Sequence, residues 1–139
     1  MDHARAFAIS SAGLELERLR VEVASVNLAN ANTVAGADGA VFQPSRVVAL
    51  AAGVDGFAGH MRRQLTVPAG RVEPAALAPR RVHEPGHPLA DARGFVAYAP
   101  VDPATEMLTL MAATRAYEAN VTAMQASKQM FTKTLDLLR

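Results

Sequence analysis

Apolar residues recur every three or four positions along residues 4–31, a stretch with no Pro and no cluster of turn residues. This spacing predicts an α-helix with a coiled-coil-like seam, because positions three and four apart lie on the same helix face. The large apolar residues of this seam are Ile9, Leu16, Leu19, Val23 and Val26.

A second apolar series, spaced by seven residues, lies about 170° round the same helix if each residue turns about 100°. It consists of Phe7, Leu14, Val21 and Leu28. A helix in a small monomer has one core to face, so two opposed apolar faces predict burial from both sides, as in an assembly. Gly13 costs the helix about 1 kcal/mol relative to Ala, and it reflects either a close approach to another backbone or a frayed start.

The strongest periodic signal covers residues 103–138, where no Pro or Gly follows Pro103. Asp102 is a suitable N-cap, and Pro103 suits the first helical position, where a missing N–H is harmless. Apolar residues alternate by three and four and are interrupted by Thr114 and Lys128. The apolar seam consists of Met107, Leu110, Tyr117, Val121, Met124, Phe131 and Leu135. A helix of this length extends about 54 Å, which is more than one compact domain of this size needs.

Residues 33–100 differ from both ends, because they hold seven of the eight Pro and only short apolar runs such as 46–50 and 64–67. Short strands joined by turns are the predicted structure. We expect turns at Asp38–Gly39, where Gly accepts a positive φ, and at residues 84–88, where two Pro fix φ. Residues 51–81 have weak periodicity and fit either a mobile loop or an extended hairpin.

The chain has 139 residues, which suits one modest domain. Because 29 of its apolar residues are Ala, few large side chains are left for a thick core. This composition favours long helices that pack against neighbours through small side chains. Met111 and Met130 lie off the seam, where adaptable side chains suit either an ordinary core or a surface that meets non-identical neighbours.

Charge and cysteine content exclude several function classes. The formal net charge of +1 gives no overall electrostatic case for nucleic acid or anionic lipid. Without Cys there is no disulfide, no thiolate nucleophile and no sulfur-ligated metal. The N-terminus lacks a basic region followed by an apolar stretch, so we expect no cleaved signal peptide. No apolar run is long enough for direct membrane insertion.

The sequence contains no motif for catalysis or ligand binding. It has no Gly-x-Ser-x-Gly elbow and no Gly-rich phosphate loop. His83 and His87 are four residues apart, but Pro85 and Gly86 between them forbid the regular helix that would bring both imidazoles to one metal ion. We therefore expect no catalytic residue, no cofactor, no metal and no small-molecule substrate.

Two stretches carry a more specific pattern. Residues 23–33 contain Asn-Leu-Ala-Asn at the end of the predicted helix, and residues 84–96 read Glu-Pro-Gly-His-Pro-Leu-Ala-Asp-Ala-Arg-Gly-Phe-Val. Both resemble the axial proteins of the bacterial flagellum, and the second is similar to a turn in the proximal rod proteins of that family. The residues that carry the resemblance are Asn27, Leu28, Ala29, Asn30, Thr33, Glu84, Pro85, Gly86, Pro88, Leu89, Ala90, Asp91 and Gly94. Residues 51–81, Val26 and Pro103 depart from the family pattern.

The resemblance implies a non-enzymatic structural subunit of the proximal rod in the periplasm, which transmits motor torque and surrounds the export channel. The implied partners are other copies of itself, other flagellar rod proteins, the rod-base adaptor protein and the type III export apparatus. The implied fold is mainly α with a small β-rich middle at residues 33–100. Residues 1–32 and 101–139 are then paired as an antiparallel coiled-coil-like inner domain. A soluble coiled-coil adaptor or export chaperone is the alternative, because it too would show heptads without an active site.

If the two terminal helices pair within one chain, their seams pack against each other and the Phe7 series meets neighbouring subunits. Lys128 then either selects the register of the pair or extends its ammonium to a carboxylate or to the channel, because a lone buried ammonium is costly. Asn27 and Asn30 are expected to cap the helix end and to bond the local backbone.

Overall fold

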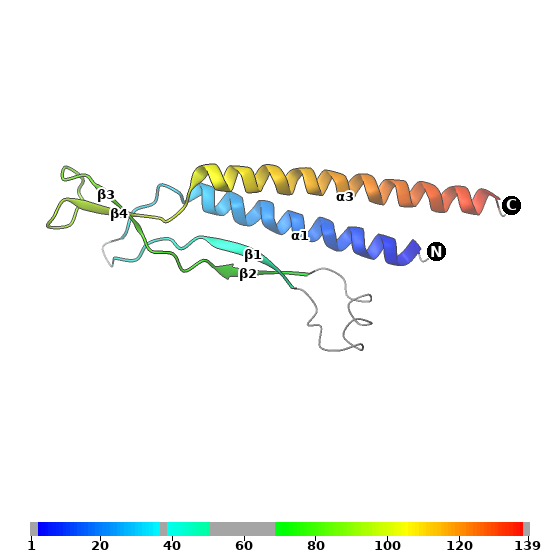
Figure 1. Cartoon of the computed structure of the whole chain (residues 1–139), viewed down its shortest axis with the longest axis horizontal. Helices are drawn as coiled ribbons and strands as arrows, with labels where there is room; N and C mark the ends of the chain where they lie inside the picture. Colours follow the sequence, from blue (N-terminus) through cyan, green and yellow to red (C-terminus); the bar gives the residue numbers. More distant parts are fainter. Residues whose placement is uncertain (1–2, 37–38, 51–68, 138–139) are drawn as a thin grey trace.

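The computed structural model describes residues 3–36, 39–50 and 69–137 of the chain. Within these residues, two long helices at the ends of the sequence flank four short strands (Figure 1). The elements are α1 (His3–Ala29), β1 (Ser45–Leu50), β2 (Ala69–Pro74), β3 (Arg80–His83), β4 (Phe95–Tyr98) and α3 (Pro103–Leu137). The predicted fold class is confirmed, since the chain is mainly helical with a small β part and the two helices run antiparallel.

The start of α3 is determined by its cap. The Oδ1 atom of Asp102 accepts a hydrogen bond from the Ala104 N–H at 3.2 Å, and its Oδ2 atom accepts one from the Thr105 hydroxyl. The bond from the Thr105 hydroxyl, and then that from the Ala104 N–H, lowers the pKa of Asp102. Pro103 is the first helical residue, as its fixed φ predicts.

The end of α1 is closed by polar side chains. Asn30 Nδ2 donates to the Val26 carbonyl at 2.8 Å, and the Thr33 hydroxyl donates to the Asn30 carbonyl at 2.8 Å. Asn30 therefore bonds the local backbone, as predicted. Asn27 does not, because its side chain reaches Ser45, 18 positions farther along the chain.

The strands form two separate antiparallel pairs. β1 pairs with β2, with Val47 opposite Val72, and β3 pairs with β4. A bridge between Val34 and Tyr98 adds the segment after α1 to the free side of β4. The predicted apolar run at 46–50 is part of β1, whereas the run at 64–67 lies outside the described residues.

The structure describes the first predicted turn in part and the second predicted turn in full. Gly39 has a φ of +72° and donates its N–H to the Gly36 carbonyl at 2.9 Å, while Asp38 lies outside the described residues. In the second turn, the His87 N–H donates to the Glu84 carbonyl at 3.0 Å. This turn connects β3 to the residues that precede β4.

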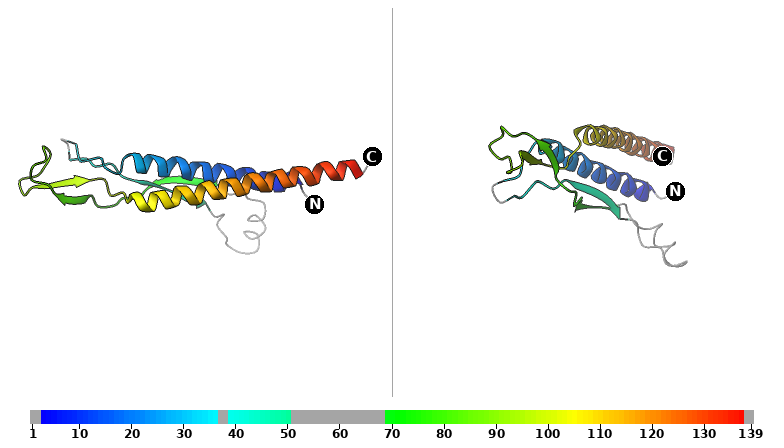
Figure 2. Two further views of the ribbon diagram at one scale, coloured as in Figure 1. Left: turned by 90° about the horizontal axis from the view of Figure 1, so that it is seen from above. Right: turned by 60° about the vertical axis from the view of Figure 1, so that its left-hand side comes forward.

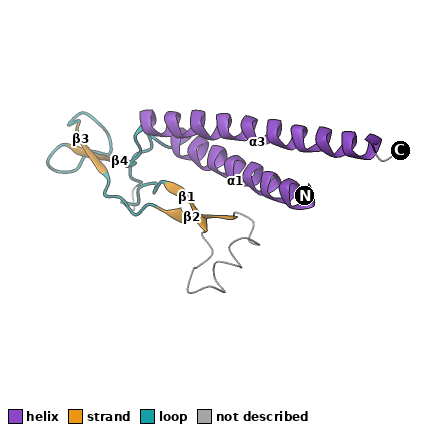
Figure 3. Ribbon diagram, turned by 45° about the vertical axis from the view of Figure 1, so that its right-hand side comes forward, coloured by secondary structure: helices purple, strands orange, loops and turns teal. Residues whose placement is uncertain are grey.

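The elements form three layers, and α1 is the middle one. α3 lies along one side of α1, and the β1–β2 hairpin lies along another (Figures 1 and 2). The β3–β4 pair extends beyond the end of the helix pair where α1 finishes and α3 starts (Figure 3). α1 therefore contacts two partners within its own chain.

The core is thin and consists mainly of small residues. A buried cluster of Ala31, Ala99 and Val101 lies near the end of α1, with Val41 and Phe42 packed against it. The composition predicts such a core, because Ala is the commonest apolar residue, and five of the seven buried apolar residues in the described part of the chain are Ala.

Candidate assembly interface

The two helices meet through small and polar residues. A methyl group on Gly13 would lie only 2.9 Å from Nδ2 of Asn120, so this glycine marks a close approach between the helices rather than a frayed start. Ala24 on α1 and Ala113 on α3 are each 2% exposed. Glu17 of α1 is also buried. Because the side chains of Gly13, Ala24 and Ala113 are short, the two helices can pack closely.

Two large apolar residues of the predicted α1 seam, Leu16 and Leu19, pack toward the hairpin, which differs from the expectation that they pack on α3. A methyl group on Gly70 of β2 would lie 2.5 Å from Cδ1 of Leu16 and 3.5 Å from Cδ2 of Leu19. Val23 lines a hollow of about 170 Å³ together with Val47 of β1 and Thr109 of α3, so it lies where the hairpin and α3 meet. The physical reason is that the hairpin covers this face of α1, so the large side chains on the face pack against the hairpin rather than against α3.

The remaining predicted residues of α1 lie at the borders of these contacts. Ile9 and Val26 are each 49% exposed. The second series is half-buried throughout and consists of Phe7, Leu14, Val21 and Leu28. Val21 lines a hollow of about 260 Å³ with Thr114 and Tyr117, so this series runs beside the edge of α3. The two-sided burial of α1 is thus supplied by α3 and by the hairpin of the same chain.

α3 carries seven of the thirteen exposed large apolar residues in the described part of the chain, because its main contact there is with α1. Of its predicted seam, Leu110, Val121 and Met124 are half-buried. Leu108 is the most exposed of these seven residues, at 67%. The other exposed ones on this helix are Met107, Met111, Tyr117, Met130, Phe131 and Leu135.

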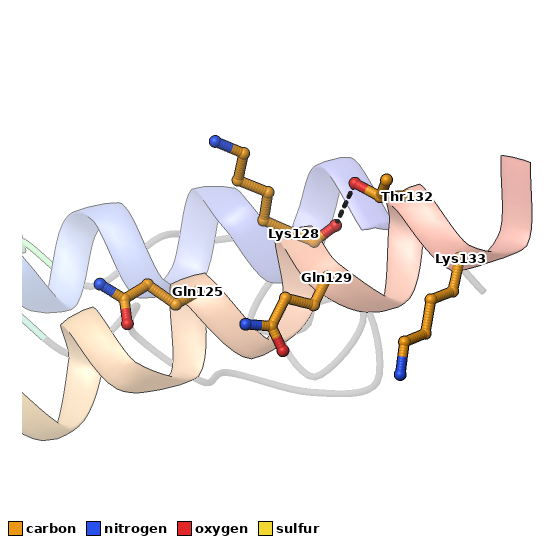
Figure 4. A pocket seen from close by; sticks show the side chains of 5 residues that line it. All are labelled: Gln125, Lys128, Gln129, Thr132 and Lys133. Atoms are coloured by element: carbon orange, nitrogen blue, oxygen red, sulfur yellow. Dashed lines mark hydrogen bonds between the residues drawn. The ribbon is translucent and has the colours of Figure 1, made fainter. Parts of the chain in front are cut away.

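The C-terminal half of α3 presents polar side chains on its surface. A hollow of about 410 Å³ is lined by Gln125, Lys128, Gln129, Thr132 and Lys133 (Figure 4). All five lie on one helix, so the described residues give this hollow only one wall. Lys128 and Lys133 extend in different directions, and Lys128 is exposed rather than buried in the seam (Figure 4).

Asn27 is the most notable buried polar residue, with 1% of its surface exposed. Its side chain bonds Ser45 at the start of β1 and Glu106 in the first turn of α3. The expected role as a local cap is therefore wrong for Asn27. Sequence reasoning missed this contact because an asparagine at a helix end is usually a cap.

The turn before β4 is organised by Asp91. Its Oδ1 atom accepts hydrogen bonds from the Arg93 N–H at 2.8 Å and from the Phe95 N–H at 2.9 Å. The bond from Phe95, and then that from Arg93, lowers the pKa of the Asp91 carboxyl. Gly94 has a φ of +78°, which favours glycine at this position.

Other residues of this turn face solvent or the neighbouring strand. The Tyr98 hydroxyl donates to Oε2 of Glu84 at 2.9 Å, and this bond raises the pKa of Tyr98. The exposed residues of the turn are Pro85, Gly86, Pro88 and Leu89, while Ala90 is half-buried. Within the part of the chain that the structure describes, no three His, Asp or Glu side chains gather as a metal site.

The comparisons with known proteins agree with the resemblance. Residues 92–137 match the family described as flagellar basal body rod FlgEFG protein C-terminal. The flagellar basal-body rod protein FlgC of Salmonella typhimurium (strain LT2) is 40% identical over 132 residues, which cover 94% of this chain and 94% of that protein. The FlgC protein of Escherichia coli O157:H7 is 37% identical over 131 residues, with 94% of each chain covered. The FlgC protein of Bacillus subtilis (strain 168) is 33% identical over 140 residues, with 93% of each covered.

The chain belongs to the FlgC family. FlgC membership makes it a structural rod subunit of the flagellar basal body, and it implies assembly with itself and with other rod components. Its FlgC relatives are named as flagellar basal-body rod proteins, and neither they nor the matching family model indicates a catalytic family. Neither of the two described helices has the length and hydropathy needed to cross a bilayer.

Three of the FlgC motif residues make structural contacts in this chain. Asn30 bonds the backbone at the end of α1, Asn27 joins α1 to β1 and α3, and Asp91 holds the turn before β4. The stripe that joins α1 to α3 also has a spacing of three and four, in the order Gly13, Glu17, Arg20, Ala24 and Asn27. A search for large apolar residues misses this stripe because most of its members are small or polar.

Proposed function

We propose that this chain is a non-enzymatic subunit of the proximal rod in the periplasm and that it packs against neighbouring rod subunits through the outer face of α3. The observation that carries the proposal is the group of large apolar side chains that the first turns of α3 expose, which are Met107, Leu108 at 67% and Met111. Neighbouring exposed apolar side chains of this kind are typical of a protein interface. Each such side chain contributes about 1.5–3 kcal/mol when an assembly buries it fully.

The exposed methionines suit more than one neighbour. Met107, Met111 and Met130 are all exposed on α3. Because Met is flexible and polarizable, it adapts to contacts that differ from one subunit to the next. We infer that copies of this chain, other rod proteins and the rod-base adaptor meet this surface, and that half-exposed residues of the Phe7 series extend it at the edge of α3.

The shape of the helix pair suits a torque-bearing shaft. α3 has 35 residues and is therefore about 52 Å long. In the proposed arrangement, residues 1–32 and 101–139 form the inner helical domain around the export channel, and residues 33–100 form the β-rich middle. The β1–β2 hairpin packs against α1, so torque applied to the β-rich middle at residues 33–100 is transmitted to the helices. The subunit reaches the rod through the type III export apparatus.

A pair of charged substitutions on one helix tests the α3 surface. Leu108→Asp removes a leucine that is 67% exposed, and Gln125→Asp adds the same charge at an exposed polar position of the same helix, where it serves as control. Since only about a third of Leu108 is buried in the single chain, the loss of folding free energy is about 0.5–1 kcal/mol.

We expect Leu108→Asp to abolish swimming in soft agar and rod formation in electron cryotomograms, while the subunit is still exported. Gln125→Asp should leave both intact. Normal rods in the Leu108→Asp strain would refute the proposed α3 interface.

A further inference from the structure

One buried amide joins three segments that lie far apart in the sequence. Asn27 Nδ2 donates to the Ser45 carbonyl at 2.8 Å and to Oε1 of Glu106 at 3.2 Å. Its Oδ1 atom accepts a hydrogen bond from the Ser45 N–H at 3.0 Å. The last turns of α1 therefore hold both the first residue of β1 and the first turn of α3.

The contact with Ser45 resembles the pairing of a neighbouring strand. Ser45 presents its N–H and its carbonyl on the side of β1 that faces away from β2. The Pro44 carbonyl points toward β2, where it accepts a hydrogen bond from the Ala75 N–H at 2.8 Å, and neighbouring residues of a strand point their backbone groups to opposite edges. One amide side chain satisfies both outward groups of Ser45. A shift of β1 by one residue would turn these groups to the other edge and leave the amide without partners.

Glu106 supplies the second acceptor that the amide needs. An amide nitrogen has two protons, and Ser45 takes only one of them. Since Asn27 is 1% exposed, water cannot readily take the other, and an unsatisfied buried donor is costly. The Glu106 carboxylate, which only accepts, completes the set.

We infer that Asn27 is a positioning residue that sets the register of the β1–β2 hairpin on the helix pair and that Glu106 is its required second acceptor. Only an amide can accept from the Ser45 N–H while donating to two oxygens. An aspartate at position 27 can still accept the hydrogen bond from the Ser45 N–H, but it cannot donate to the Ser45 carbonyl or to Glu106. It also places a second carboxylate beside Glu106. Arg20 and Arg46 line the same hollow as Glu106 and offset part of this repulsion.

The test compares two substitutions with the same chemistry at the same helix end. Asn27→Asp is compared with Asn30→Asp, because Asn30 donates only to the Val26 carbonyl of its own helix. Both add one negative charge near the C-terminus of α1, so the effect on the helix dipole is matched. The readout is hydrogen exchange at the Ser45 amide of the full chain, measured by NMR.

We expect Asn27→Asp to accelerate exchange at Ser45 by about 10- to 100-fold, because loss of both donations and repulsion from Glu106 open the contact even though a carboxylate can still accept from the Ser45 N–H. Asn30→Asp should change the exchange rate by less than about 3-fold. Adding Glu106→Gln to Asn27→Asp should restore at least about 5-fold of the protection, because a glutamine amide can donate to the new carboxylate. Adding Glu106→Gln to Asn30→Asp should restore none. Equal effects of the two aspartates, absence of the Glu106→Gln rescue, or unprotected Ser45 in the wild type would each overturn the inference.

Discussion

Enlarging Ala113 would test whether the helices really pack through small residues. Ala113 is 2% exposed, so its methyl group is already in contact on all sides. Ala113→Leu adds three carbon atoms where the neighbouring helix leaves no room, and overpacking of this kind costs about 1–3 kcal/mol. Leu and Ala have similar helix propensities, so little of this cost is offset. The ratio of folded to unfolded chains should fall by roughly 5- to 150-fold.

Ala112→Leu is the matched control, because Ala112 is the preceding residue on α3 and is exposed. We expect thermal unfolding followed by circular dichroism to show a midpoint several degrees lower for Ala113→Leu and one within about a degree of wild type for Ala112→Leu. Equal midpoints for the two variants would show that Ala113 does not lie in a close helix contact, and the description of the interface would be wrong.

Two further substitutions test the remaining close contacts. Gly13→Ala should raise the free energy of unfolding by about 1 kcal/mol through helix propensity, but only in a chain that also carries Asn120→Ala. In the wild type the new methyl group would meet the Asn120 side chain at 2.9 Å. A urea-unfolding cycle that shows the same gain with and without Asn120→Ala would contradict this. Asp91→Ala removes the acceptor for the Arg93 and Phe95 amides. Because folding lowers the pKa of Asp91, the ionised carboxyl stabilises the folded state. This contribution to the free energy of unfolding is complete above the ordinary pKa of 3.8 and is lost as the pH falls through the folded-state pKa. The difference between the thermal midpoints of wild type and Asp91→Ala should therefore be complete at about pH 6 and should shrink as the pH falls below 3.8, and a difference that stays constant with pH would disprove the role of the carboxylate.

The local features of this chain follow from its sequence. Both helices, with ends within two residues of those observed, the cap at Asp102 and the strand at 46–50 were predictable, because each depends on residues within about four positions of one another. The FlgC resemblance was equally readable, since Asn27–Asn30 and the turn at residues 84–96 are contiguous motifs. The thin core also follows from composition, because Ala dominates the apolar residues.

Only the tertiary structure decides which face of α1 meets which partner. Leu16 and Leu19 have the periodicity of a helix seam, yet they pack toward Gly70 of the hairpin. α3 instead approaches over Gly13 and Ala24, because two helices come closest where their side chains are shortest. Periodicity gives the faces of a helix but not their occupants, since the choice depends on how several elements compete for one surface.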